Sequence, residues 1–281
     1  SWYFEYSLKH WRVQGACLMD HPKSEIGPWA DIGTQGSDSK ELDLAALAQV
    51  DLSPIGTIET ALAVGANLPG YPGAVCYRKF KRRLQRRAEA RFSELCRALG
   101  PADIALDLGA NIGDLTVHLA ANGATVYAYE PEPETFGLLS ERFAQSANVH
   151  LHQAAVSDRD GTTELILPAS FREKPRSASK AASIAHDRYL GPGHIAHTVF
   201  MHNITTIIRA LPKLPALIKM DIEGAELAVL EAMRKNGLVG PRMAVFVETH
   251  ERLDPASLPR VRALQKWGRE EALGYVNLYW G

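Results

Sequence analysis

The sequence has few cysteines, no long apolar run and almost no net charge. Its 281 residues include three cysteines, Cys17, Cys76 and Cys96, which lie far apart along the chain. An odd number of widely spaced cysteines forms neither a disulfide framework nor a zinc pattern, so we expect a reducing, cytoplasmic environment. No stretch approaches the ~18 apolar residues that a membrane span needs. The formal charge of -1 gives no general attraction to nucleic acid or to anionic membranes.

The composition is that of an ordinary globular protein. Hydrophobic residues make up 46% and charged residues 22%, which excludes a disordered or collagen-like chain. The length fits one large domain, or one domain of ~200 residues with an appendage. Residues 1–18 begin with Ser and lack the apolar core of a signal peptide. Because Met19 is a plausible start, we treat residues 1–18 as an addition that need not be native.

The N-terminal region changes character near residue 76. Residues 20–75 are rich in Gly, Pro, Ser and Asp, so we expect 1–75 to form an irregular lead-in with one or two short helices. Over 76–100, apolar residues recur every three or four positions and predict an amphipathic helix, an N-terminal helical extension of the main domain. Its apolar stripe consists of Phe80, Leu84, Ala88, Phe92, Leu95 and Leu99. Its basic face consists of Arg78, Lys79, Lys81, Arg82, Arg83, Arg86, Arg87 and Arg91.

Strands and helices alternate over residues 101–281, which we take as the main domain. We expect strands at 104–107, 125–130, 149–156, 163–167, 217–221, 245–248 and 275–280, and helices at 112–121, 132–147, 225–236 and 258–273. Asp160-Gly161 is typical of a hairpin turn before the strand at 163–167. This alternation predicts an α/β fold with a mostly parallel central sheet and helices on both faces. Ligands bind such sheets beyond the carboxyl ends of the strands, so residues at those ends are the first functional candidates.

Residues 168–203 match no element of this pattern. We interpret them as a variable loop or lid over an acceptor site, because long loops at such positions usually serve function. The segment contains His186, His194, His197 and His202. The spacing His194-x-x-His197 is that of a metal-binding pair, but no helix supports it, so we assign no metal ligands.

The first predicted strand runs into a glycine-containing turn. The segment Asp107-Leu108-Gly109-Ala110-Asn111-Ile112-Gly113-Asp114 joins this strand to a helix, and its two glycines permit close approach of a ligand. Asn111 occupies the middle glycine position of the dinucleotide fingerprint, which argues against a nicotinamide-dependent oxidoreductase. Glu130 ends the second strand, where an acid usually binds ribose hydroxyls. Asp107 at the end of the first strand suits a cationic group, and Glu130 suits a ribose. With no diphosphate site, this combination fits S-adenosylmethionine.

These residues resemble motif I of the class I S-adenosylmethionine-dependent methyltransferases, and two later segments narrow the resemblance to the FkbM family. The segments are Ala154-Ala155-Val156-Ser157-Asp158 with Gly161, and Ile218-Lys219-Met220-Asp221-Ile222-Glu223-Gly224-Ala225-Glu226. The resemblance covers residues 104–251. It implies a Rossmann-like class I methyltransferase fold, S-adenosyl-L-methionine as cofactor, and O-methylation of a hydroxyl on a sugar or polyketide-type small molecule.

The resemblance also implies roles for individual residues. Gly109, Asn111 and Gly113 shape the cofactor loop, and Asp107 lies near the methionine amino group. Glu130 holds the ribose hydroxyls, while Ser157 and Asp158 contact the adenine. Asp221 and Glu223 line the site beside the transferable methyl group.

The acceptor hydroxyl must lose its proton as it attacks, and four side chains are candidates for the proton acceptor. They are Asp221, Glu223, Glu248 and His250, in no firm order. Asp221 and Glu223 have two other interpretations: they cap the following helix, or they hold a divalent cation. Glu226 is either a surface acid or part of the site, and Lys219 is expected to pair with a neighbouring acid.

One alternative belongs to another functional class. The chain would be a non-catalytic binding module that keeps the cofactor fold and holds an anionic partner, such as RNA or acidic lipid, through the basic helix at 78–91. The simpler interpretation is that the basic residues of that helix form a solvent-exposed face without a partner role. The sequence sets neither the identity of the acceptor nor the oligomeric state, because acceptor pockets are built from loops that match no recognisable pattern.

Overall fold

The computed structural model describes residues 56–66, 68, 70–167, 193–240, 243–250, 255–272 and 275–280. The chain divides into two compact units, one containing the described residues up to 86 and the other containing those from 87 onward. The predictions for residues 1–18, and for most of the lead-in, lie outside the described residues. Among the helices that are described, none combines the length and the apolar character needed to cross a membrane.

The first unit contains helix α2 (Gly56–Gly65) and the beginning of helix α3 (Gly70–Ala98). The amphipathic helix predicted at 76–100 is therefore confirmed, but it starts earlier, at Gly70. Arg83 lies 3.9 Å from the buried carboxylate of Glu59, and Arg91 pairs with Glu94 at 2.9 Å. These acids offset part of the basic face, as expected for a solvated face; whether the face also holds an anionic partner stays a prediction.

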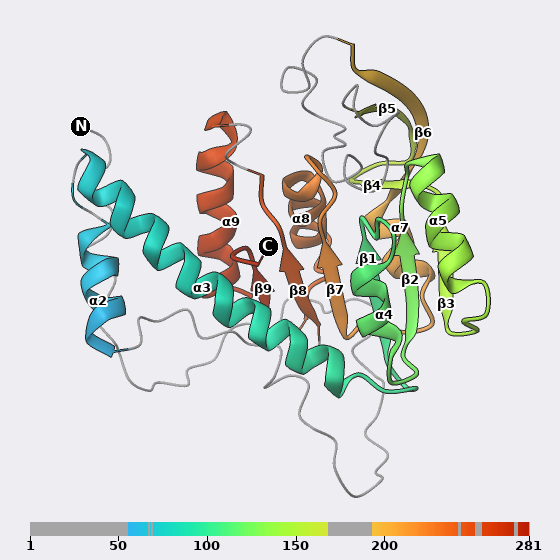
Figure 1. Cartoon of the computed structure of the whole chain (residues 1–281), viewed down its shortest axis with the longest axis horizontal. Coiled ribbons are helices and arrows are strands. Elements are labelled where there is room, and N and C mark those ends of the chain that lie inside the picture. Colours follow the sequence, from blue (N-terminus) through green and yellow to red (C-terminus); the bar gives the residue numbers. More distant parts are fainter. Residues whose placement is uncertain are drawn as a thin grey trace, which may run out of the picture. The chain divides into compact units, whose positions relative to one another are not determined.

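A six-stranded sheet forms the centre of the second unit (Figure 1). Its order is β3-β2-β1-β7-β8-β9, and every neighbouring pair is parallel. The strands are β1 (Ile104–Leu108), β2 (Thr125–Tyr129), β3 (Val149–His152), β7 (Leu217–Met220), β8 (Ala244–Val247) and β9 (Val276–Asn277). Their near-continuous apolar character follows from burial on both faces. The predicted α/β, Rossmann-like arrangement is confirmed.

Helices cover both faces of this sheet. On one face, Leu106, Ile218 and Val245 pack in a single core with α7 (Ile204–Ala210), α8 (Glu226–Lys235) and α9 (Leu258–Glu270), the last of which follows the short helix η4 (Pro255–Ser257). The other face carries α4 (Asp114–Ala120), α5 (Pro133–Phe143) and the last turns of α3. Phe92 of α3 packs edge-on against Phe246 of β8, with ring centroids 5.4 Å apart, which anchors the end of α3 to the sheet.

A second, three-stranded sheet overturns the strand predicted at 149–156. That segment splits into β3 of the central sheet and β4 (Ala155–Ser157) of a sheet ordered β4-β6-β5. Strand β5 (Gly161–Leu167) is antiparallel to β6 (Ile195–Asn203), and β4 is parallel to β6. The predicted hairpin at Asp160-Gly161 is therefore wrong, because β6 lies between the two strands that this turn connects.

Strand β6 also corrects the predicted loop at 168–203. Residues 195–203 form the central strand of the small sheet, and α7 follows directly. The strand exposes alternate side chains, those of Ala196, Thr198, Phe200 and His202, so its sequence lacks a clean alternation of polar and apolar residues. Residues 168–192 lie outside the described part of the chain, so the lid remains a prediction.

Candidate functional site

A cavity of about 320 Å³ lies where the carboxyl ends of β1, β2, β7 and β8 meet the small sheet. This volume is within the range of small-molecule sites. Its lining comes from Gly109, Ala110, Asn111, Asp114, Leu115, Tyr129, Glu130, Pro131, Ala154, Ala155, Val156, Leu165, Lys219, Asp221, Ile222, Glu223 and Glu248. The site therefore forms at the edge of the sheet that the strand pattern predicts.

The turn after β1 has a backbone that requires glycine. Gly109 and Gly113 adopt φ angles of 79° and 86°, and Asn111 adopts 50°. A Cβ at Gly109 would collide with the carbonyl oxygen of Asp221, and a Cβ at Gly113 would collide with the ring of Phe143. The turn is thus pressed against both the loop after β7 and helix α5, and it brings bare backbone to the cavity.

Glu130 fastens this turn to the end of β2. One carboxylate oxygen accepts a hydrogen bond from the N–H of Asn111 at 2.9 Å, and the other accepts one from the N–H of Glu132 at 2.9 Å. Burial raises the pKa of Glu130 to about 7, although both hydrogen bonds oppose the shift. Glu130 lines the cavity, as its predicted role requires.

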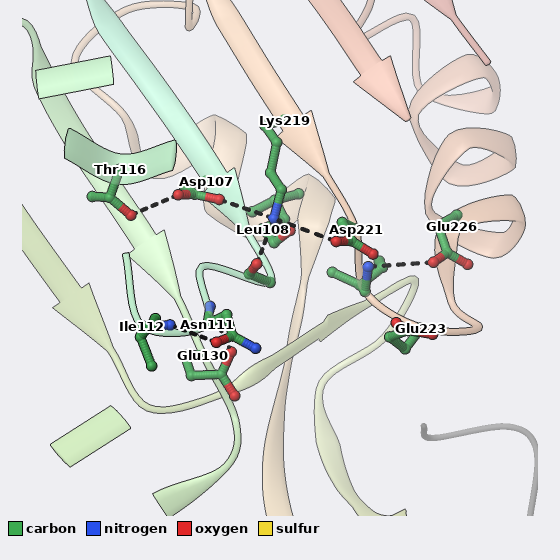
Figure 2. A network of polar contacts seen from close by, with 12 residues as sticks. Asp107, Leu108, Asn111, Ile112, Thr116, Glu130, Lys219, Asp221, Glu223 and Glu226 are labelled. Carbon is green, nitrogen blue, oxygen red and sulfur yellow. Dashed lines mark hydrogen bonds and ion pairs between the residues drawn. The ribbon is translucent and has the colours of Figure 1, made fainter. Parts of the chain in front are cut away.

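Asp107 and Lys219 form a buried pair beneath the turn (Figure 2). Asp107 accepts a hydrogen bond from the Thr116 hydroxyl at 2.6 Å and lies 3.3 Å from the Lys219 ammonium. Burial lowers the pKa of Lys219, but Asp107 and Asp221 outweigh it and raise the pKa above its ordinary value. Lys219 also donates to the backbone oxygen of Gly109. The expected pairing of Lys219 with an acid is confirmed, whereas the Asp107 carboxylate is not among the groups that line the cavity.

The loop between β7 and α8 is held by a buried acid, Glu226. Its side chain is 4% exposed and accepts hydrogen bonds from the N–H groups of Ile222 and Gly224 at 3.2 and 3.0 Å. This excludes the surface position considered for Glu226. Helix α8 has Ala225 as its N-cap and no side-chain capping hydrogen bond, so neither Asp221 nor Glu223 caps it by a hydrogen bond; a favourable interaction of these acids with the helix dipole stays a prediction.

His250 lies among three carboxylates. Its Nδ1 is 3.1 Å from Glu226, and its Nε2 is 3.1 Å from Glu223 and 3.8 Å from Asp221. Burial lowers the pKa of His250, but the hydrogen bonds to Glu223 and Glu226 outweigh it and raise the pKa to about 11. A histidine that is protonated at neutral pH cannot take a proton from an acceptor, which argues against its predicted role as a base.

Glu223 lines the cavity and burial raises its pKa, but His250 holds it at 3.1 Å. Two other acids at the cavity are suited to accept a proton. Burial raises the pKa of Glu248, and nearby Asp221 raises it further. Asp221 Oδ1 is buried and has no hydrogen-bond partner among the described residues. Both side chains line the cavity. Raised basicity and an unspent acceptor atom are the properties that a general base needs.

Some residues singled out in the sequence do not line the cavity. Ser157 is buried and donates to Asp158 at 3.1 Å, but the cavity is lined by Ala154 to Val156, directly before them. His197 lies 3.4 Å from Glu132, and the candidate metal-ligating group of the described residues contains neither His194 nor His197. Sequence reasoning did not single out the apolar wall residues Tyr129 and Leu165, for which an apolar position at a strand end was the available signal.

The profile of the methyltransferase FkbM domain matches residues 107–276. Hexuronic acid methyltransferase AglP of Haloferax volcanii is 27% identical over 168 residues, which cover 60% of this chain and 64% of that protein. This chain thus spans somewhat less than two thirds of that relative's length.

Two solved structures are also similar. A precorrin 8w decarboxylase from Methanobacterium thermoautotrophicum matches with a TM-score of 0.34 and 16% identity, covering 60% of this chain and 64% of that chain. A precorrin-6y C5,15-methyltransferase from Geobacter metallireducens matches with a TM-score of 0.34 and 13% identity, covering 64% and 70%. Because the FkbM profile spans more than half of the chain and all the strand ends that form the cavity, this chain belongs to the methyltransferase FkbM domain family.

Proposed function

We propose that this protein is an S-adenosylmethionine-dependent methyltransferase that methylates a hydroxyl group of a sugar or a polyketide-type small molecule. Membership of the FkbM domain family supports methyl transfer. The similarity to a hexuronic acid methyltransferase favours a sugar as the acceptor. The observation that carries the proposal is the cavity that brings the turn after β1, Glu130 and the acids after β7 and β8 together.

The cavity fits a cationic cofactor with a ribose. Its lining contains five carboxylates, from Asp114, Glu130, Asp221, Glu223 and Glu248, and one ammonium group, from Lys219; Arg142 pairs with Asp114 at 2.7 Å and His250 with Glu223 at 3.1 Å. Asp107, which lies behind Lys219, offsets that one positive charge. A sulfonium and an amino group would lower the resulting repulsion among the acids. Each Glu130 oxygen accepts one backbone hydrogen bond in the described structure, and a carboxylate oxygen has a second lone pair for a ribose hydroxyl.

The chemistry divides between the cofactor and the chain. When bound, S-adenosylmethionine supplies a methyl group whose bond to sulfur breaks, with its electron pair going to sulfur, as the acceptor oxygen bonds to carbon. Glu248 and Asp221 are placed to take the proton that the acceptor hydroxyl loses. Tyr129, Val156 and Leu165 form an apolar wall that would exclude water from the reacting groups.

Calorimetry with S-adenosylhomocysteine tests the cofactor part of the proposal. We expect micromolar binding to the full chain, and no binding of NAD. Glu130→Ala should weaken binding by about 10- to 100-fold, because a charge-assisted hydrogen bond contributes roughly 1.5–3 kcal/mol. Glu134→Ala, a change at an exposed carboxylate in the first turn of α5, is the matched control. A folded protein that does not bind S-adenosylhomocysteine would refute the proposal.

Methyl transfer from labelled S-adenosylmethionine to a panel of sugars, uronic acids and polyketides tests the acceptor part. Asp221→Asn and Glu248→Gln should each lower the rate by about 10²-fold, as for loss of a proton acceptor, while the melting temperature stays within a few degrees. Normal turnover by both variants would remove these residues from the reaction.

A further inference from the structure

We propose that Asp221, Glu223 and His250 bind one divalent first-row transition cation at the acceptor side of the cavity. The inference rests on the proposed function only for the use of the cation, because the site itself is argued from its geometry. Sequence analysis left a divalent cation on Asp221 and Glu223 as an open alternative and did not consider His250 as its third ligand.

The three side chains converge from two neighbouring strand ends. Asp221 and Glu223 follow β7, and His250 follows β8. One ligand atom from each, a carboxylate oxygen or a ring nitrogen, lies within 4.8 Å of the other two. Figure 2 shows Asp221, Glu223 and Glu226 gathered around the loop that leads into α8. A cation between these atoms needs only small side-chain movements to reach ligand distances.

The histidine is already oriented as metal-bound histidines are. Its Nδ1 is held at 3.1 Å by Glu226, whose oxygens are fixed in turn by the N–H groups of Ile222 and Gly224. This leaves Nε2 directed at Asp221 and Glu223, and a cation bound there would displace the proton that Nε2 carries in the metal-free protein. A carboxylate that holds the far nitrogen of a histidine is the usual support of a metal ligand, since it fixes the ring and strengthens its basicity.

Asp221 supplies an independent observation. Its Oδ1 is buried, has no hydrogen-bond partner among the described residues and lies 3.8 Å from His250 Nε2. A proton on Nε2 can serve Glu223 at 3.1 Å, but it does not reach Asp221 with hydrogen-bond geometry. A cation lying between the three ligand atoms would satisfy both carboxylates. Asp221 Oδ1 thus lies within ion-pair distance of His250 but beyond hydrogen-bond distance, a position suited to a ligand of a cation shared with Glu223.

The ligand set indicates the class of metal. Two carboxylate oxygens and one imidazole nitrogen suit Mn²⁺, Fe²⁺ or Zn²⁺ better than Ca²⁺ or Mg²⁺, which prefer oxygen alone. Three protein ligands leave positions open for an acceptor oxygen. Such a cation would lower the pKa of the acceptor hydroxyl, and Glu248, which also lines the cavity, would receive the proton.

The test is a titration of the chelator-treated full chain with Mn²⁺, in which electron paramagnetic resonance measures the free ion. We expect one equivalent of Mn²⁺ to bind, and Zn²⁺ to compete for it. Asp221→Asn and His250→Gln should remove saturable binding, and Glu226→Gln should weaken it by about 10- to 100-fold, as for loss of a supporting carboxylate. The control is Glu231→Gln on the same helix, which changes an exposed acid paired with Arg260 and should bind as the parent does.

The outcomes separate this inference from the proposed function. If the parent protein shows no saturable binding of Mn²⁺ or Zn²⁺, or if Asp221→Asn binds as tightly as Glu231→Gln, the cation site is refuted. S-adenosylhomocysteine binding, measured on the same preparations, then reports independently on the cofactor site. Metal binding without S-adenosylhomocysteine binding would refute the proposed function and leave the cation site standing. Circular dichroism identifies any variant that fails to fold; Asp221 is 30% exposed, so its amide variant is the most secure.

Discussion

Glu130 gives the most direct test of the electrostatics beneath the cavity. Its carboxylate is buried and holds two backbone N–H groups, yet burial raises its pKa from 4.5 to about 7. The folded protein therefore binds this proton more tightly than the unfolded chain does. The stabilising contribution of Glu130 is fully present below pH 4.5 and is lost as the pH rises through 7.

Replacing Glu130 with Gln removes this titration. At about 1.4 kcal/mol per pKa unit, the shift corresponds to a total of about 3 kcal/mol, most of which falls between pH 5 and pH 8. The variant also loses at least one backbone hydrogen bond, but that loss is nearly independent of pH. The difference in unfolding free energy between variant and parent should consequently move by about 2 to 3 kcal/mol in favour of the variant over this interval.

Urea unfolding of both proteins at half-unit steps from pH 5 to pH 8 measures this difference. Glu134→Gln provides the control, since it removes an exposed carboxylate in the first turn of α5, four residues after Glu130, and should follow the parent at every pH. Parallel pH profiles for the parent and Glu130→Gln would show that Glu130 is ionised without cost in the folded state. The argument from burial would then fail, whatever the absolute stability of the variant.

Three further outcomes follow from the packing. Gly109→Ala should abolish S-adenosylhomocysteine binding and lower the melting temperature, because the new Cβ would collide with the backbone oxygen of Asp221. Gly137→Ala in α5, where a Cβ meets open space, should instead raise the unfolding free energy by about 0.5–1 kcal/mol. Lys219→Met should lower the unfolding free energy by about 3–5 kcal/mol in urea, because it leaves the buried Asp107 without its cation, and a smaller loss would mean that water reaches the pair. Phe92→Ala should destabilise the second unit by about 3–5 kcal/mol in the same assay, and an unchanged midpoint would exclude α3 from its core.

Much of the central sheet can be predicted from the sequence, because the patterns that mark its strands and turns are local. The segment from Asp107 to Gly113 predicts the end of a strand, a tight turn and the start of a helix, and Glu130 indicates the end of the next strand. Strand β6 was not predicted because its exposed positions, Ala196, Thr198, Phe200 and His202, mix apolar and polar residues. Its pairing with β4 and β5 is also set across long sequence separations. Local periodicity carries no information on which strands will pair.

The candidate site was only partly predictable for a related reason. Residue type and spacing placed Asp221, Glu223 and Glu248 at the cavity, since each follows a buried strand. The inward position of Glu226 depends on backbone N–H groups that the loop leaves unpaired, and the state of His250 depends on three carboxylates from another strand end. Such properties arise from tertiary contacts and have no counterpart in the spacing of residues.

The loops after β1 and β7 contact each other directly through their backbones. Gly109 lies against the carbonyl of Asp221, the N–H of Asp221 donates to the oxygen of Leu108 at 3.0 Å, and Lys219 donates to the oxygen of Gly109. A ligand that shifts one loop must therefore shift the other. Cofactor occupancy and the geometry of the acids after β7 are then thermodynamically coupled. The coupling is reciprocal: a ligand bound at Asp221 changes the affinity for the cofactor by the same factor by which the cofactor changes the affinity for that ligand.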